Sequence, residues 1–283
     1  MQIFHQKQPL TEFLEPYIVK KRTVGLVPTM GALHEGHLSL VKHALQDNDL
    51  VIVSIFVNPT QFNNEEDLLQ YPRTLQKDID TLKSLGENLI IFNPRVEEMY
   101  PENENPRSSQ FDFDGLETLM EGSYRPGHFN GVGTIVKKLL ETVTPQNAYF
   151  GEKDYQQLLI VKKLVRKYNF PVTVIGCPIL REANGLAMSS RNQRLPDDVR
   201  KKASIIYKTL LLVKEMFVIQ TASQIKEQVA ASFKTKNDFT LEYLEIAETD
   251  SLKSAEQKEE GKTYRAFIAV YAGNVRLIDN IEL

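Results

Sequence analysis

Cysteine is nearly absent from this 283-residue chain, and long apolar runs and blocks of one charge are absent altogether. The one cysteine, Cys177, can form neither an internal disulfide nor a thiolate metal site, which favours a reducing compartment. No apolar run approaches the roughly 20 residues that cross a bilayer. A formal net charge of −3 gives no sign of a nucleic-acid or membrane surface. The first ten residues do not resemble a signal peptide, so we expect a cytoplasmic protein.

Two common phosphate-binding motifs are also missing. The chain contains no G-x-x-x-x-G-K-[ST] and no G-x-G-x-x-G after an apolar run. The sequence therefore supports neither a P-loop enzyme nor a standard NAD dehydrogenase.

What is present predicts an α/β fold with a doubly wound (Rossmann-like) parallel sheet. Short apolar runs typical of buried strands alternate with stretches that have helical spacing, which is the pattern of right-handed strand–helix–strand units. We expect strands at 23–29, 50–57, 88–94, 147–151 and 172–177. We expect the main helices at 37–46, 74–86, 131–143 and 155–169.

Two further regions have a different sequence pattern. Residues 100–115 are polar and rich in turn residues, which predicts a surface excursion with a small hairpin. After Pro196, helices at 197–217 and 221–236 precede alternating runs at 239–248, 264–272 and 275–283. We therefore predict a Rossmann-like ligand-binding domain at 1–183 and a smaller α+β C-terminal domain at 184–283 that contributes a lid loop.

The unusual polar residues follow the predicted strands. The stretches PTMGALHEGH, NPTQF, GEKDYQQ and REANGLAMSSRN each come directly after a strand. Ligands of open parallel sheets bind at the carboxyl ends of the strands, near the switch in strand order. We therefore expect four distant loops to converge on one crevice.

The first of these loops holds two histidines three residues apart, His34 and His37. Glycines at 31 and 36 allow close approach of a ligand, and a helix that begins near His37 directs free N–H groups toward an anion. Imidazoles placed there can hydrogen-bond phosphate oxygens. The alternative is a pair of purely structural histidines. A zinc site is disfavoured, because the metalloprotease motif spaces its histidines by four on a formed helix.

The loops after the second and fourth predicted strands carry amides and a lysine. Lys153 can neutralise phosphates, and Gln157, one helical turn further, would share its face. Asn58 and Gln61 suit hydroxyls and carboxylates. A surface ion pair at Lys153 and simple turn chemistry at Asn58 are the alternatives.

The last loop combines two hydroxyls with Arg191 in MSSRN, a grouping that can hold a departing polyphosphate and close over it. Arg125 and His128, in SYRPGHF, either contact a ligand or fasten their loop.

Together these blocks resemble a known family. His-x-Gly-His with Met-Ser-Ser-Arg is similar to the nucleotidyl-transfer superfamily of class I aminoacyl-tRNA synthetases and cytidylyltransferases. Within it, VPTMGALHEGHLSLV, SIFVNPTQF, YPRTLQKD, RPGHFNGV, YFGEKDYQQL and AMSSRN, in order from Thr23 to Arg194, resemble the pantoate–β-alanine ligase (pantothenate synthetase) family. The C-terminal third carries no motif of its own.

The resemblance implies a cytoplasmic ligase of pantothenate and coenzyme A biosynthesis. Pantoate would attack the α-phosphorus of ATP to give a pantoyl-adenylate and diphosphate, and β-alanine would then release pantothenate and AMP. It also implies Mg²⁺ carried mainly by the ATP phosphates, with Asp78 as a candidate ligand or neighbour of the metal. The family usually forms homodimers, and no nucleic-acid or membrane partner is expected.

Carried over by position, the resemblance also implies a set of site residues. The catalytic residues would be His34, His37 (as proton donor), Lys153 and Arg191. ATP would contact Met30, Gly31, Ala32, Leu33, His34, Glu35, Gly36, His37, Gly151, Glu152, Lys153, Asp154, Leu180 (beside the adenine), Met188, Ser189, Ser190 and Arg191. Pantoate would contact Gln61 and Gln157, with Asn58 as a further candidate, and the protein ligands of the metal stay unknown.

Two other functions compete with this one. A nucleotidyltransferase that stops after attaching the nucleotide would share HEGH but would need a basic pocket for a phosphorylated substrate. A non-catalytic nucleotide sensor would not need both histidines, Lys153 and Arg191 together.

Overall fold

The computed structural model describes residues 1–101 and 110–283 and divides the chain into two compact units. Unit 1 contains Met1–Glu152 and Gln157–Pro178, and unit 2 contains Lys153–Gln156 and Ile179–Leu283. Four residues that follow the fifth strand, Lys153–Gln156, thus belong to the second unit. The division into domains at residues 183 and 184 stays a prediction.

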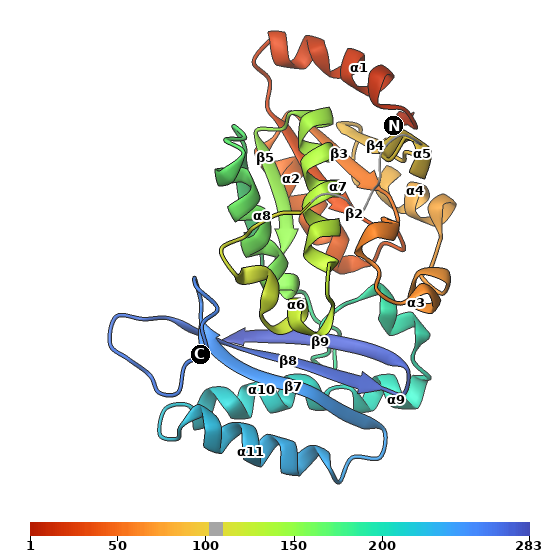
Figure 1. Cartoon of the computed structure of the whole chain (residues 1–283). Coiled ribbons are helices and arrows are strands. Elements are labelled where there is room, and N and C mark those ends of the chain that lie inside the picture. Colours follow the sequence, from red (N-terminus) through yellow and green to blue (C-terminus); the bar gives the residue numbers. More distant parts are fainter. Residues whose placement is uncertain (102–109) are drawn as a thin grey trace. The chain divides into compact units, whose positions relative to one another are not determined.

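Unit 1 is built on a six-stranded sheet in which every neighbouring pair is parallel (Figure 1). Its strands are β1 (Ile3–Phe4), β2 (Val24–Thr29), β3 (Leu50–Ile55), β4 (Leu89–Phe92), β5 (Asn147–Gly151) and β6 (Thr173–Cys177). They lie in the order β1-β4-β3-β2-β5-β6. From β2 the chain winds outward through β3 and β4, and from β5 it winds the other way to β6. The switch point therefore lies between β2 and β5.

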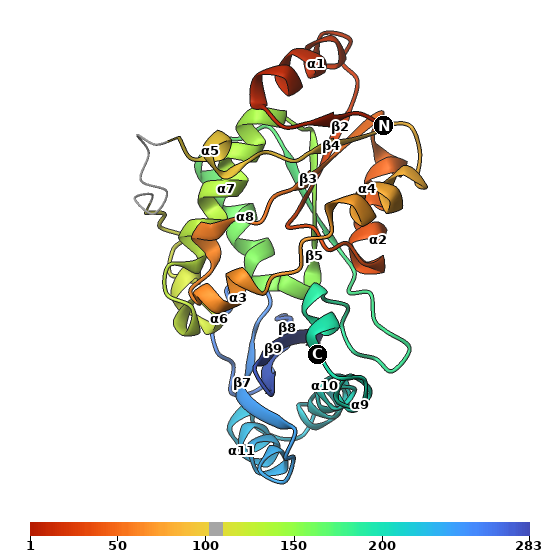
Figure 2. The same cartoon turned by 90° about the vertical axis from the view of Figure 1, so that its right-hand side faces the viewer.

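Helices cover both faces of this sheet, with α2 and α4 on one side and α7 and α8 on the other (Figure 2). The helices of the region are α1 (Lys7–Val19), α2 (Glu35–Asp47), α3 (Glu65–Leu69), α4 (Leu75–Lys83), α5 (Val96–Met99), α6 (Met120–Tyr124), α7 (His128–Val143) and α8 (Tyr155–Lys167). Val51, Val53 and Ile91 of the sheet pack with Val41 of α2 and Leu82 of α4 in one buried cluster. Because both faces of the strands are covered, β2 and β3 are apolar without alternation.

Unit 2 contains three helices and an antiparallel sheet with the order β7-β8-β9. Its elements are α9 (Asp197–Lys202), α10 (Ile205–Met216), α11 (Ala222–Phe233), β7 (Phe239–Glu248), β8 (Tyr264–Ala272) and β9 (Val275–Glu282). Alternate β8 residues, among them Ile268 and Val270, pack with Leu210 of α10 and Ile225 of α11. The predicted class, a parallel α/β sheet followed by a smaller α+β part, is confirmed.

The structure differs from the sequence prediction at the N-terminal edge of the sheet and in the helices of unit 2. The prediction missed β1 and α1, although β1 adds a sixth strand at the sheet edge. The single helix predicted at 197–217 is two helices, α9 and α10, separated at residues 203–204. Residues 102–109 of the predicted hairpin lie outside the described residues. Within the described ranges, no helix combines the length and apolarity that crossing a membrane requires.

Candidate functional site

The loop after β2 ends in the first turn of α2, where both histidines lie. Helix α2 begins at Glu35, two residues before the expected start, so His34 is its N-cap. The Gly36 N–H donates to Nδ1 of His34 at 3.1 Å, and the His34 N–H donates to Nδ1 of His37 at 3.4 Å. The two rings lie 4.0 Å apart, centroid to centroid. The imidazoles thus cap the helix, and they stand at the end that attracts anions.

A buried carboxylate, Asp78 of α4, fixes the backbone of this loop. Its oxygens accept from the N–H groups of Ala32 at 2.9 Å and Leu33 at 2.8 Å. The Thr74 hydroxyl also donates to it at 3.1 Å. Gly31 and Ala32 both have positive φ, 81° and 48°, a conformation that costs energy for alanine and is held here by Asp78. Both oxygens of Asp78 are engaged, so we assign it to the loop rather than to a metal.

The loop after β3 adjoins the loop after β2. Nε2 of Gln61 lies 2.9 Å from Sδ of Met30. Asn58, which is buried, donates to Oε1 of Gln61 at 3.1 Å and to the Gly131 carbonyl at 3.1 Å, and it accepts from the Tyr100 hydroxyl at 2.8 Å. Asn58 also caps η1 (Pro59–Gln61). We therefore assign Asn58 to orienting Gln61.

Arg125 and His128 fasten the same loop. Nδ1 of His128 lies 2.8 Å from the Gln61 carbonyl oxygen, and Nη2 of Arg125 donates to that oxygen at 3.2 Å. A Cβ at Gly131 of α7 would lie 2.5 Å from the Thr60 carbonyl, so only glycine permits this approach. Of the two roles that the sequence left open for Arg125 and His128, these contacts support fastening.

Lys153 lies in η3 (Glu152–Asp154), the short 3₁₀ turn between β5 and α8. Because α8 begins at Tyr155, the expectation that Lys153 and Gln157 lie one α-helical turn apart does not apply. The Lys153 ammonium lies 3.4 Å from Asp154 Oδ1, and its side chain is mostly buried. Asn280 of β9 donates to the Lys153 carbonyl oxygen at 2.9 Å.

The segment that was predicted as a lid is a hydrogen-bonded turn. The Met188 N–H donates to the Leu180 carbonyl at 3.0 Å, which places the two ends of the segment side by side. Leu180 is 40 % exposed. Ser189 caps η4 (Ser190–Arg194) by accepting from the Arg191 N–H at 3.3 Å. Closure of this segment over a ligand stays a prediction.

The predicted site residues thus form two groups, one in each unit. Unit 1 brings together Met30, His34, His37, Asn58 and Gln61, and its Gly151 ends β5. Unit 2 holds Lys153 and Asp154, and separately Leu180 with Met188–Arg191. The gathering of both groups around one triphosphate stays a prediction.

Two features of the described residues concern metal binding and the state of the cysteine. No three side chains of His, Cys, Asp or Glu there gather closely enough to hold a metal ion. Cys177, at the end of β6, is buried, and burial raises the pKa of its thiol to about 11. The thiol is therefore protonated at neutral pH.

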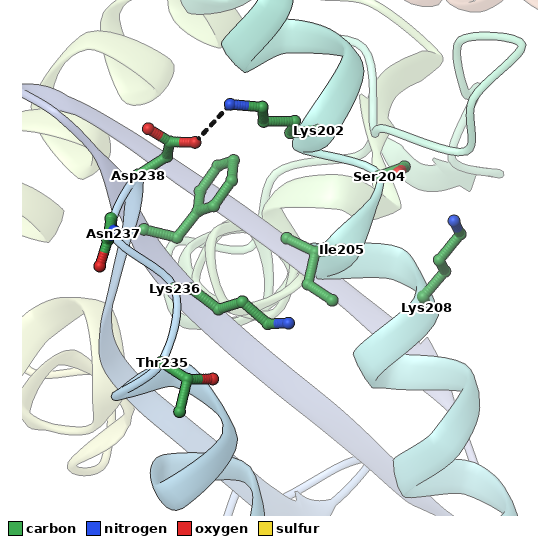
Figure 3. Close-up of a pocket in the computed structure, with 9 residues that line it drawn as sticks. Lys202, Ser204, Ile205, Lys208, Thr235, Lys236, Asn237 and Asp238 are labelled. Carbon is green, nitrogen blue, oxygen red and sulfur yellow. Dashed lines mark hydrogen bonds and ion pairs between the residues drawn. The ribbon is translucent and has the colours of Figure 1, made fainter.

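Unit 2 contains a cavity of about 400 Å³. It lies between the start of α10 and residues 235–239, and the Lys202–Asp238 ion pair at 2.7 Å crosses its edge (Figure 3). None of the predicted ATP or pantoate residues lines it.

Sequence reasoning missed the anchoring role of three residues that hold these groups in place. It named Asp78 only beside a metal, and it did not name Asp279 or Asn280. The signal for the last two is present in VRLIDNIEL, where two adjacent polar residues interrupt an apolar strand. Both are nearly inaccessible to solvent. Buried polar residues in a strand require partners, and those partners identify their role.

Comparisons with known proteins agree over the whole chain. The family model described as pantoate-beta-alanine ligase matches residues 2–282. A pantothenate synthetase from Flavobacterium psychrophilum is 53 % identical over 283 residues, which is all of both chains. The solved structure of pantothenate synthetase from Thermus thermophilus has a TM-score of 0.90 at 41 % identity and covers 100 % of this chain and 99 % of that one. The pantoate-beta-alanine ligase of Francisella tularensis, complexed with "Beta-gamma ATP" and β-alanine, has a TM-score of 0.81 at 37 % identity, covering 100 % of this chain and 97 % of that one.

Proposed function

The chain belongs to the pantoate–β-alanine ligase family and joins these two substrates, and we propose that it does so through ATP and a pantoyl-adenylate. The observation that carries the proposal is the pair of imidazoles in the first turn of α2, beside the switch point of the sheet. The helix dipole and the two imidazole donors favour a phosphate there.

The chemistry explains why ATP is required. A carboxylate is a poor acyl donor, because its oxygen would have to leave as oxide. In the first step a pantoate carboxylate oxygen forms a bond to the α-phosphorus, and the bond to diphosphate breaks. In the second step the β-alanine amine attacks the acyl carbon, AMP leaves with the electron pair, and the amine loses a proton.

The unit 1 residues act on both reactants in this proposal. His34 and His37 donate to phosphate oxygens as charge grows on the leaving diphosphate, and His37 supplies a proton. Gln61, with its backbone fastened by Arg125 and His128, presents its side-chain amide to pantoate. Gln157 is a second contact to pantoate. Asn58 acts by orienting the Gln61 amide.

The unit 2 residues supply the remaining cations. Lys153 neutralises the transferring phosphates, and the backbone of residues 151–154, of which 151 and 152 belong to unit 1, holds the ribose and phosphates. Leu180 contacts the adenine, and Met188–Arg191 hold the triphosphate, with Arg191 as a forked donor. Mg²⁺ bound to the ATP phosphates would supply further charge neutralisation. A homodimer and a cytoplasmic location complete the proposal.

The test is exchange of labelled diphosphate into ATP. We expect exchange that requires pantoate and proceeds without β-alanine, because the adenylate forms first. Absence of exchange in folded protein would refute the adenylate route. Exchange supported by a phosphorylated alcohol would instead indicate a nucleotidyltransferase.

His37 and His43 both lie on α2, so His43 provides the matched control for His37. His37→Ala should lower exchange by roughly 10²–10³-fold, the usual loss for one transition-state donor. His43→Ala, on the exposed side of α2, should leave exchange unchanged. Equal activity of the two variants would show that His37 does not take part.

A further inference from the structure

Strand β9 places two adjacent polar residues on opposite faces of the unit 2 sheet. Asp279 pairs in register with Ile268, which belongs to the core beneath α10 and α11, so Asp279 shares that face. Asn280 pairs with Phe267 and therefore lies on the other face. Both side chains are almost fully buried, Asn280 being 1 % exposed. An apolar pair would satisfy the strand equally well, so these two polar groups require an explanation.

On the first face, Asp279 holds the turn that begins at Leu180. Arg181 donates to its two oxygens at 2.6 and 3.0 Å and to the Gly185 carbonyl at 3.1 Å. The Arg181 guanidinium also lies 3.7 Å from the ring centroid of Tyr207. Burial raises the pKa of Asp279, while the charges of Arg181 and Lys153 act in the opposite direction. The carboxylate thus fixes the segment to which we assign adenine and triphosphate contacts.

On the second face, Asn280 holds the segment that contains Lys153. Its amide nitrogen donates to the Lys153 carbonyl at 2.9 Å, across 127 residues of sequence. Its amide oxygen accepts from Nη1 of Arg265 at 2.6 Å. The Arg265 guanidinium lies 4.1 Å from the ring centroid of Tyr155, two residues after Lys153. Asn280 and Arg265 therefore hold the Lys153 segment at two points, the Lys153 carbonyl and the Tyr155 ring.

We propose that Asn280 is a positioning residue for the ligase reaction: its amide fixes the backbone of Lys153, and thereby the place of the ammonium. The inference rests on the proposed role of Lys153. A fixed Cα matters because it restricts the positions that the long lysine side chain can give its ammonium, and because a misplacement of about 1 Å can cost roughly 10²-fold in rate.

The most selective perturbation is Asn280→Asp. The substitution keeps an oxygen for Arg265 but removes the N–H that the Lys153 carbonyl accepts. Asn237→Asp makes the same chemical change at an exposed site of unit 2 and serves as the control. In pantoate-dependent diphosphate exchange, Asn280→Asp should lower kcat by about 10–100-fold and leave KM for pantoate within about twofold. Asn237→Asp should match the unchanged protein.

A double-mutant cycle separates positioning from general destabilisation. In a Lys153→Met background, Asn280→Asp should cause no further loss of exchange, because the group that it positions is gone. An equal loss in both backgrounds, or full exchange by folded Asn280→Asp, would overturn the proposal. If Asn280→Asp does not fold, Arg265→Lys, which alters the contact that orients the Asn280 amide, enters the same cycle with the same expected outcomes. Full exchange by Lys153→Met would refute the proposed role of Lys153 itself. That result differs from equal losses in the two backgrounds, which would refute only the positioning role of Asn280.

Discussion

Replacing Asp78 with asparagine should weaken the loop that carries the two histidines. The carboxylate serves three donors: Oδ2 accepts from Ala32 N–H, and Oδ1 accepts from Leu33 N–H and the Thr74 hydroxyl. The asparagine oxygen can replace only one of these oxygens. If it stays at the position that serves two donors, the new NH₂ faces the Ala32 N–H, which then loses its acceptor.

The expected loss of stability follows from the number of hydrogen bonds that the substitution removes or weakens. A lost hydrogen bond to a charged acceptor costs about 1.5–3 kcal/mol, and the two bonds that survive become neutral and weaker. Because the site is nearly inaccessible to solvent, water does not restore the lost bond. We therefore expect Asp78→Asn to lower the free energy of unfolding by about 2–4 kcal/mol. For a unit of this size, that corresponds to a melting temperature roughly 4–16 °C lower.

A second aspartate on α4 provides the control. Asp80 is exposed and lies 3.6 Å from Lys83, so Asp80→Asn should change the unfolding free energy by less than about 0.5 kcal/mol. Melting followed by circular dichroism measures both variants, and diphosphate exchange below the transition measures the loop. Asp78→Asn should also lower exchange, since Ala32 and Leu33 directly precede His34. Identical melting of the two variants would refute the anchoring role of Asp78.

Two further predictions concern residues at the ends of β5 and β6. A Cβ at Gly151 would meet no atom within 4 Å, so Gly151→Ala should leave melting nearly unchanged and raise KM for ATP in exchange assays if the nucleotide approaches this backbone. An unchanged KM would place the ribose elsewhere. The pKa of Cys177, raised from 9.0 to about 11, should make its alkylation at pH 8 about 100-fold slower than in urea-unfolded protein, rising tenfold per pH unit up to that pKa. Rapid alkylation of native protein would contradict this burial.

The parallel sheet could be predicted because its central strands carry a strong local signal. The runs around β2 and β3 are apolar at nearly every position, as strands covered on both faces are. Strand β1 has only two residues, Ile3 and Phe4, which is too short for any periodicity. Helix α1 contains Pro16 and buries only Leu10 and Leu14, so its pattern is weak. Predictions of elements therefore succeeded where the local apolar signal is strong and failed at the two-residue edge strand β1 and at α1.

The candidate site was only partly predictable, for a related reason. Residues that follow strands can be located from the sequence, because the carboxyl ends of parallel strands form the binding edge. The roles of Asn58, Arg125 and His128 depend instead on contacts to Gln61 and Gly131 from elsewhere in the chain. The sequence allowed Asp78 to be interpreted as a ligand or neighbour of a metal. A sequence shows that this residue is charged, but it does not show that the side chain is buried.

Each unit uses a buried polar side chain to fix the backbone beside a candidate site residue. In unit 1 the carboxylate of Asp78 accepts from backbone N–H groups next to His34, and in unit 2 the amide of Asn280 donates to the backbone of Lys153. Each anchor is buried on a regular element, where its own side chain has little freedom. The segments at the strand ends can then hold the imidazoles and the ammonium in fixed positions, because the anchors and not the segments' own sequences fix the backbone conformation. Loss of an anchor should therefore lower kcat even though the anchor touches no substrate, and this separates anchors from binding residues, whose loss raises KM.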